Sequence, residues 1–344
     1  MAAIRTRWAS AAVIALAVIA VAAPVSARWV ERFYSSGFYP LLQPPLTRLS
    51  NRVPFALDDV VLVGAGLAVL VWLVRALLSP RMQGLAFLRR TATLAAAILL
   101  VSIVTFGANF RRQPLRETAA FDASRVSADA VFTLAQLTVR VLNDTYDELP
   151  AQWPDDSAVR ATLAPLFREA ARAGAAWRPE LARPKRSILD PWMRRIGMNG
   201  YFLPFFHEVA MNSALLPFER PYVLAHEWGH GLGRANESEA AYFGWLTCEK
   251  GPPWARYSAW LRVLDYVSAD LSRDQRRALY AQLSEGPRRD IDASRRRVLA
   301  QYRPALRRVN ESVTNRAAQV AGVGAEQRDY GLLVQLMLGM PPAP

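Results

Sequence analysis

Three long apolar runs in the first third of the chain constrain its fold more than any other feature. The first extends without a charge from Trp8 to Ala27, the second from Val60 to Leu78 with only Arg75 inside it, and the third from Thr91 to Ala108. A helix of about 20 apolar residues crosses the hydrocarbon core of a bilayer. The whole stretch 1–108 holds only ten basic and three acidic side chains. We therefore predict a membrane region over residues 1–110 with three spans, at about 8–27, 60–78 and 91–108.

Charges at the ends of these runs predict the orientation. Arg5 and Arg7 precede the first run, and the 75–90 connection carries four arginines and no acid. Short basic segments stay in the cytoplasm, so three crossings place residues 111–344 outside it. Arg111, Arg112 and Arg116, just after the third run, favour the opposite orientation. The first run also fits a signal peptide, with the small residues 25–27 as the cleavage pattern, and this leaves the orientation unchanged.

The 28–59 connection between the first two runs is rich in aromatic residues and proline. It holds two Phe-Tyr pairs, at 33–34 and 38–39, and four prolines. One interpretation is a belt of aromatic residues at the lipid headgroups. The other is a wall over an active site that lies near the membrane.

The remainder, residues 111–344, reads as a mostly helical domain. Apolar residues recur at helical spacing from Val126 to Leu142, and the chain from Tyr222 onward is again helical in pattern. Residues 201–206 and 209–216 are short, aromatic and apolar, which is typical of strands and favours a hairpin. Residues 178–195 are rich in Pro and Arg and suggest a surface loop.

Two composition features exclude whole classes of site. The single cysteine, Cys248, excludes an intrachain disulfide and any metal site with several cysteines. The net charge is +13, but acidic residues interleave with the arginine clusters at 295–297 and 307–308, and no nucleic-acid motif accompanies them. We therefore expect a solvated helix face there and no nucleic-acid partner.

The chemistry is indicated by His226-Glu227-Trp228-Gly229-His230, an HExxH motif that uses two of only three histidines. With three His and 14 Glu in the chain, chance predicts about 0.0007 such matches. On a helix, positions i and i+4 share a face, so His226 and His230 can bind one Zn²⁺. Glu227 would then accept a proton from the attacking water. The plainer alternative is a pair of structural histidines on a buried helix.

A hydrolytic zinc site needs a third protein ligand and one open position. The chain after the motif supplies carboxylates, Glu237 and Glu239, which stand about 200° apart on a helix and cannot both face the metal. We favour Glu237, three residues before Ala240, a spacing that resembles the Glu-x-x-Ala element of many membrane-anchored zinc peptidases. Glu239 is the alternative ligand, or a residue that orients a ligand histidine. Gly231 and Gly233 end the motif helix, and Asn236 caps the next.

Two further roles are open in the sequence. A strand before the HExxH helix often pairs with an extended substrate, and Val209 to Ser213 is the candidate edge strand. His207 and Glu208 at its start either contact ligands or substrate, or form an exposed polar strand end. Tyr, His or Arg usually stabilises the oxyanion, and the candidates by residue type are Tyr201, Tyr242, Tyr330 and His207.

Several segments together resemble an uncharacterised bacterial family of membrane proteins with three amino-terminal spans and an HExxH domain. The matching residues are the 200–205 run, Glu208, Asn212, 217–219, the HExxH to Glu-x-Glu-Ala block, the aromatic 29–40 stretch, 54–58, and 309–310 with 330–331. The family usually carries Asn where this chain has Ala241, which removes a hydrogen bond but no proposed ligand. The resemblance implies a zincin-like metallopeptidase fold and a bacterial inner membrane, and it brings no substrate.

These observations predict a mainly α protein: three transmembrane helices, then a zincin-like domain with a small hairpin before the HExxH helix. We expect a multi-pass zinc metallopeptidase with an extracytoplasmic domain, in which His226, His230 and Glu237 hold Zn²⁺ and Glu227 is catalytic. Its partners would be the lipid bilayer and a peptide or protein substrate. A non-catalytic zinc-binding sensor or scaffold, and a cell-wall amidase, are the alternatives.

Overall fold

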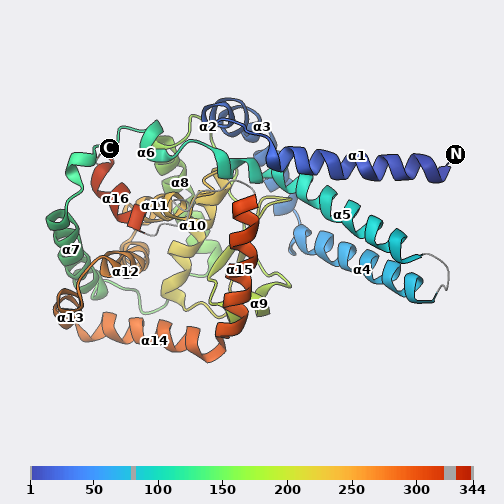
Figure 1. Ribbon diagram of the computed structural model, residues 1–344. Coiled ribbons are helices and arrows are strands. Elements are labelled where there is room, and N and C mark those ends of the chain that lie inside the picture. The colour runs from blue at the N-terminus through green and yellow to red at the C-terminus, as the bar shows by residue number, and fades with distance from the viewer. Residues whose placement is uncertain (1, 79–82, 321–330, 342–344) are drawn as a thin grey trace.

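The computed structural model describes residues 2–78, 83–320 and 331–341, and these form a helical body with a helical stalk. The stalk consists of α1 (Ala2–Ala22), α4 (Leu57–Leu78) and α5 (Gln83–Thr105), which pack side by side and project from one side of the body (Figure 1). The amino-terminal end of α1, the end of α4 and the start of α5 are all at the end of the stalk away from the body.

Two of the three expected spans are helices long and apolar enough to cross a membrane, namely α4 and α5. The helix α5 begins at Gln83, eight residues before the predicted span, and ends at Thr105. The first candidate differs, because Arg7–Ala22 passes the same test only when joined to Ala27–Asn51, from which it is bent by 108°. A third crossing therefore stays a prediction.

The segment after α1 turns back along the body instead of forming a free linker. It contains α2 (Ala27–Trp29), the π-helix η1 (Val30–Phe38) and α3 (Tyr39–Asn51). Tyr39 is fully buried, and its hydroxyl donates to the carbonyl of Gly231 at 3.1 Å. The 28–59 connection is thus part of the wall of the body.

The body is mainly helical, as the sequence predicts. Its elements after α5 are η2 (Gly107–Arg111), α6 (Leu115–Thr118), η3 (Ala123–Arg125), α7 (Ala128–Tyr146), α8 (Asp156–Ala170), η4 (Ala171–Ala173), α9 (Asp190–Ile196), η5 (Pro217–Glu219), α10 (Arg220–Gly231), α11 (Glu237–Glu249), α12 (Pro253–Ala269), α13 (Arg273–Ala281), α14 (Glu285–Gln301), α15 (Pro304–Val320) and α16 (Gly331–Gly339). One continuous core joins α7, α8, α10, α11, α12 and α16. This core surrounds the two helices that carry the predicted metal ligands.

A three-stranded sheet lies beside α10. The predicted hairpin is confirmed as β2 (Gly200–Leu203) paired antiparallel with β3 (Glu208–Met211). The predicted loop 178–195 is wrong in part, because β1 (Pro184–Lys185) pairs parallel with β3, and α9 follows. The strand order is β1-β3-β2. The expectation that Val209 to Ser213 is an edge strand is therefore also wrong, since β1 covers its other side and leaves β2 at the edge.

The sheet is held by a buried ion pair and is attached to the stalk. Lys185 Nζ lies 2.6 Å from Glu208 Oε1, and both side chains are buried. The backbone N–H of Asp58, in the first turn of α4, donates to Glu208 Oε2 at 2.9 Å. The Asp58 carboxylate in turn accepts from the N–H groups of Phe205 and Phe206 in the hairpin turn. The hairpin thus rests on the body end of α4.

Candidate functional site

The HExxH residues lie on α10, and His226 and His230 share one face of this helix, as their spacing predicts. His226 and His230 are one turn apart, and their ring centroids are 4.9 Å apart with perpendicular planes. On the opposite face Trp228 is buried, and its indole N–H donates to the carbonyl of Ala182 at 2.9 Å. This anchor fixes the rotation of α10 and directs both imidazoles to the same side.

The third candidate ligand comes from α11, which begins where the sequence predicts. Asn236 is its N-cap, accepting from the N–H groups of Ser238 and Glu239. The helices α10 and α11 approach so closely that a Cβ on Gly229 would lie 2.8 Å from Cα of Ala240. Glycine at the fourth position of the motif, and alanine three residues after Glu237, therefore allow the contact that brings Glu237 to the histidines.

Three donor atoms converge between these helices. Glu237 Oε2 lies 3.3 Å from His226 Nε2, and Glu237 Oε1 lies 3.7 Å from His230 Nε2. One donor atom of each residue falls within 4.8 Å of the other two. Donor atoms on a tetrahedral zinc at 2.0–2.2 Å are roughly 3.3 Å apart. The three donors lie within 4.8 Å of one another and would contract toward that spacing around a zinc ion, and the Glu237 side chain is 44% exposed.

The charges of this cluster also suit a cation. Burial lowers the pKa of His226, which favours its neutral, ligating form. Burial lowers the pKa of His230 as well, but the Glu237 carboxylate, the charge of Glu227 and the hydrogen bond to the Arg234 carbonyl together outweigh it and raise that pKa to about 9. Desolvation would raise the pKa of Glu237, but the two histidines outweigh it and hold that pKa well below its usual range. The metal-free cluster thus holds a proton that a divalent cation can replace.

Glu227 lies on the same helix in a water-poor position. It is 4% exposed, and its Oε2 has no hydrogen-bond partner among the described residues. Desolvation by burial raises the pKa of this carboxyl to about 8. A Cβ on Gly200 would collide with Glu227 Oε1, so glycine in β2 makes room for the carboxylate. A carboxyl with a pKa near neutrality can both take up and release a proton at physiological pH.

His230 is oriented by a backbone carbonyl. Its Nδ1 donates to the carbonyl oxygen of Arg234 at 2.8 Å, which directs Nε2 toward Glu237. Arg234 itself is buried, with its guanidinium donating to Glu239 Oε2 at 3.3 Å and to the carbonyl of Gly174 at 2.6 Å. Arg234 therefore fixes the loop after α10 twice, with its backbone carbonyl on His230 and with its guanidinium on Glu239 and Gly174.

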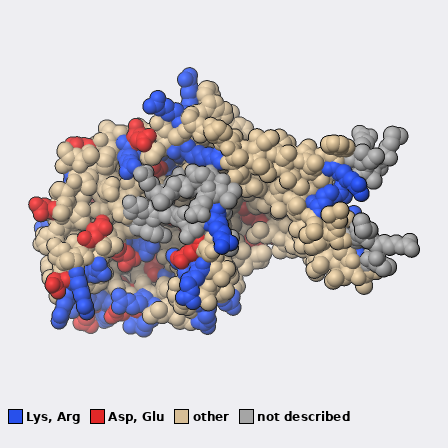
Figure 2. All heavy atoms as spheres, viewed as in Figure 1, with Lys and Arg blue, Asp and Glu red and all other residues tan. Residues whose placement is uncertain are grey.

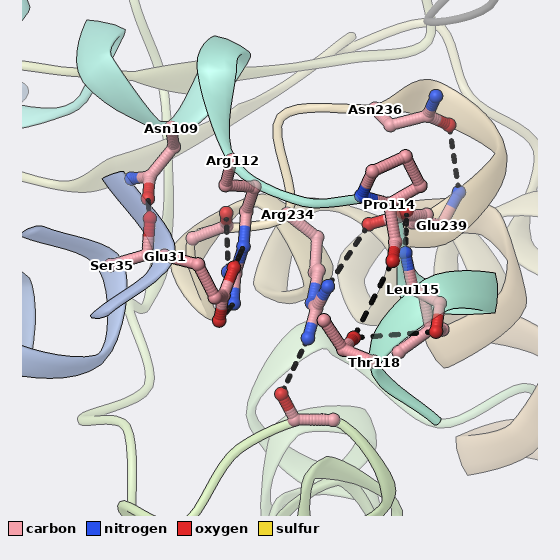
Figure 3. Close-up of polar contacts among 12 residues, drawn as sticks. Glu31, Ser35, Asn109, Arg112, Pro114, Leu115, Thr118, Arg234, Asn236 and Glu239 are labelled. Atoms are coloured by element: carbon pink, nitrogen blue, oxygen red, sulfur yellow. Dashed lines mark hydrogen bonds and ion pairs between the residues drawn. The ribbon is translucent and has the colours of Figure 1, made fainter. Parts of the chain in front are cut away.

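A second arginine connects this loop to the base of the stalk. Arg112 forms two hydrogen bonds with the carboxylate of Glu31 in η1, at 2.7 and 2.9 Å, and donates to the carbonyl of Gly233 at 2.8 Å. Figure 3 shows Arg112 and Arg234 side by side between Glu31 and Glu239. These contacts make the position of the Arg234 carbonyl, and so the orientation of His230, depend on residues at the base of the stalk.

The two carboxylates that the sequence leaves as alternatives separate clearly in the structure. Glu237 meets both histidines, whereas Glu239 is 2% exposed and bonds Arg234 and the backbone N–H of Leu115, the latter at 2.5 Å. The charged Arg234 compensates the buried charge of Glu239. Glu239 thus acts on His230 only through the Arg234 loop.

The candidates for oxyanion stabilisation also fall into different environments. His207 is buried, with Nε2 2.8 Å from the carbonyl oxygen of Thr105, and Tyr242 is buried among aromatic side chains of α11. Tyr330 lies outside the described residues. Tyr201, in β2, is half-exposed, and its pKa is raised by desolvation and by the charges of Asp58, Glu227 and Glu237. Of these four, Tyr201 is the side chain that the structure brings into the field of the cluster.

His207 and Glu208 do not form an exposed strand end, since neither side chain reaches solvent. His207 stacks on Phe202, and Glu208 pairs with Lys185.

Sequence reasoning missed Tyr39, Arg112 and Arg234 as partners of the site. Arg234 orients His230 with its backbone carbonyl, for which a sequence carries no signal. Arg112 did leave one, because it belongs to the basic group after the third run that contradicts the predicted orientation. A buried pairing with Glu31 explains why a basic residue stands there.

Comparison with known proteins assigns the chain to a family without assigning an activity. Residues 34–338 match the model of a family described as a protein of unknown function (DUF3810), and the chain belongs to this family. No curated protein and no solved structure matches the chain. The expected membership of an uncharacterised family is confirmed, and an argument for function rests on the site.

Proposed function

We propose that this protein is a membrane-anchored zinc metallopeptidase with its body on the extracytoplasmic side of a bacterial inner membrane. His226, His230 and Glu237 would hold the zinc, and Glu227 would be the catalytic acid–base. The convergence of these three donors beside a buried carboxylate, one oxygen of which is unpaired among the described residues, carries the proposal. The zincin-like character of the body is part of the same proposal.

A zinc ion bound there would supply Lewis acidity toward a peptide carbonyl and the attacking water. Glu227 takes a proton from that water as its oxygen bonds to the carbonyl carbon. The same proton then passes to the amide nitrogen as the C–N bond breaks, which gives a carboxylic acid and an amine, and the acid then passes its proton to the amine or to solvent. Tyr201, whose pKa is raised by desolvation and by the charges of Asp58, Glu227 and Glu237, would donate a hydrogen bond to the oxyanion.

The edge strand β2 offers a place for the substrate backbone. The N–H of Asn212 donates to the carbonyl of Asn199, and bonded pairs alternate along an antiparallel ladder. The backbone groups of Gly200 and Phe202 consequently face away from β3. Because Gly200 lies against Glu227, an extended peptide added to this edge would pass beside the catalytic carboxylate.

The charge distribution supports the proposed orientation. Figure 2 shows basic residues at the far end of the stalk, where α1 begins and where α4 and α5 are joined. Two of the three arginines whose position favours the opposite orientation form contacts within the protein. Arg111 donates to the carbonyls of Val21 and Ala23 at the end of α1, and Arg112 is paired with Glu31.

The first test is metal content and turnover of the full chain purified in nanodiscs. We expect about one zinc per chain, lost in His226→Ala and in Glu237→Gln and kept in Glu239→Gln. Glu227→Gln should keep the zinc and lose at least about 100-fold in turnover. Glu285→Gln, on an exposed side chain of α14, is the matched control. Absence of zinc from the wild-type chain would refute the proposal.

The same variants separate the alternatives. A non-catalytic zinc sensor would bind zinc, and Glu227→Gln would then reproduce every property of the wild type. An amidase would release cell-wall fragments instead of cleaving envelope proteins, so both products should be profiled in a deletion strain complemented with wild type or Glu227→Gln.

A further inference from the structure

We infer that the body docks on the bilayer surface through an apolar rim at the base of the stalk, and that its substrates are extended peptide segments next to a membrane anchor. We define this rim by six residues, Trp29, Phe33, Leu41, Phe55, Ile188 and Trp192. The docking rests on the surface of the molecule and on the stalk helices crossing the bilayer, and it does not depend on the peptidase function. The substrate class also rests on the proposed peptidase function.

The segment 27–51 turns apolar side chains outward and buries several polar ones. Ser35, Gln43, Thr47 and Ser50 are each no more than 1% exposed, beside the buried Val30, Tyr34 and Tyr39. Its outward side is apolar, with Leu41 75% exposed and Trp29 and Phe33 each more than half-exposed. Surface segments in water show the opposite pattern. An outward apolar face next to membrane helices matches a segment that lies in the interface of a bilayer.

The direction of this segment agrees with that placement. It is bent by 108° from the axis of α1 and lies across the base of the stalk (Figure 1). If the stalk crosses the bilayer, the segment therefore runs close to the membrane plane. Arg32 and Arg48 are exposed along it, and arginine beside aromatic residues suits anionic headgroups.

The body contributes the rest of the rim at the same level. Asp59, in the first turn of α4, accepts from the Ser187 hydroxyl at 2.7 Å and from the backbone N–H of Ile188 at 2.9 Å. Ile188 is 55% exposed and is thus held where α4 leaves the body. Trp192 follows in α9 with its ring partly exposed, and Trp is enriched at membrane interfaces.

The hairpin connects the candidate site to the base of the stalk, where the rim lies. Its turn contacts two of the three stalk helices: Asp58 of α4 accepts from Phe205 and Phe206, and His207 contacts the carbonyl of Thr105 at the end of α5. From Phe205 back to Gly200 is five residues, or at most about 17 Å of strand. Glu227 therefore lies within about 17 Å of the body ends of α4 and α5, a distance that about five residues of extended peptide would span.

Docking is tested with single-cysteine probes in the full chain. Cys248 is buried, so cysteines introduced as Ile188→Cys and Leu41→Cys can be labelled with an environment-sensitive fluorophore. Leu137→Cys, on α7 at the side of the body away from the stalk, is the control. In nanodiscs of phosphatidylethanolamine and phosphatidylglycerol carrying shallow spin-labelled lipid, we expect at least twofold quenching at 188 and 41 and none at 137. Equal quenching at all three positions, or none, overturns the docking.

The substrate class is tested with one degenerate peptide pool in proteoliposomes that contain the zinc-loaded chain. The pool is offered free, attached directly to a lipid anchor, and attached through a short or a long flexible Gly/Ser spacer, the long one well beyond the reach of the site from the bilayer. We expect cuts within about five residues of the anchor, and at least tenfold less cleavage of the same sequences behind the long spacer. If the lipid anchor acted only by concentrating the peptide at the bilayer surface, cleavage would not depend on the length of the spacer. That result overturns the inference.

Two controls separate this failure from that of the proposed function. Glu227→Gln should cut no form of the pool. If the wild-type chain cuts none of them while the quenching pattern holds, the peptidase proposal and the substrate class are both overturned and the docking stands.

Discussion

Removal of the buried cation Lys185 tests how the sheet beside the site is held. Its Nζ donates to Glu208 Oε1 and to the carbonyl of Ser50, both at 2.6 Å, and to the carbonyl of Phe55 at 3.0 Å. Lys185→Met leaves the Glu208 carboxylate fully buried beside Asp58, which offers it a backbone N–H and a carboxyl group but no positive charge. An uncompensated buried charge costs about 3–5 kcal/mol of unfolding free energy.

The double variant Lys185→Met/Glu208→Gln should be more stable than Lys185→Met alone. The amide that replaces the carboxylate is neutral, its oxygen can still accept from Asp58, and its NH₂ can donate toward the carbonyls that Lys185 leaves. We expect the double variant to lie only about 1–2 kcal/mol below the wild type, the scale of one or two imperfect hydrogen bonds. A second substitution that restores stability is the signature of a compensated charge pair.

Thermal unfolding of the full chain in detergent, followed by tryptophan fluorescence at a fixed scan rate, measures both variants. At about 2–4 °C per kcal/mol, Lys185→Met should lower the midpoint by about 6–20 °C, and Glu208→Gln should recover more than half of that loss. A double variant as unstable as the single one would refute the argument that Lys185→Met destabilises the fold by leaving Glu208 as an unpaired buried charge.

Four further outcomes follow from contacts around the cluster. Gly229→Ala should lower zinc occupancy and thermal stability, because its Cβ meets the backbone of α11 at 2.8 Å, whereas Gly64→Ala in α4 meets nothing within 4 Å and should be neutral or stabilising. Arg112→Met should weaken zinc binding about 10–100-fold in a competition titration, and Arg289→Met, on an exposed side chain, should not. Zinc affinity should rise about tenfold per pH unit from about pH 7 to 9, because binding displaces the proton of His230, whose pKa is about 9. In the metal-free chain the same raised pKa stabilises the fold at low pH, and this contribution should fall as the pH rises through about 9. A pH-independent affinity would contradict the proton held by the cluster.

Local patterns were sufficient for the elements that depend on neighbouring residues. The spacing of His226 and His230 placed both on one helix face, and Asn236 caps the next helix because its side chain bonds N–H groups two and three residues away. The hairpin was readable from two short apolar runs. The apolar runs at 60–78 and 91–108 correspond to α4 and α5, because hydrophobic length is a property of the segment itself.

Contacts between distant segments decided the remainder. The choice between Glu237 and Glu239 depends on how closely α11 packs on α10, which is set by Gly229 and Ala240. The strand β3 is central only because β1, from an earlier stretch that reads as a loop, pairs with it across the intervening helix α9 and strand β2.

The aromatic connection after α1 shows the same limit most clearly. Its residues suggested an interfacial belt or a wall of the site. In the structure one side of this segment is buried against the body and the other exposes apolar side chains near the stalk, so the two interpretations apply to opposite sides of the same segment. Motif spacing determines the candidate chemistry because ligands four residues apart share a helix face in any fold. The supports of that chemistry come from Tyr39, Arg112 and Lys185, whose partners lie on separate elements of the chain and were brought to them only by folding.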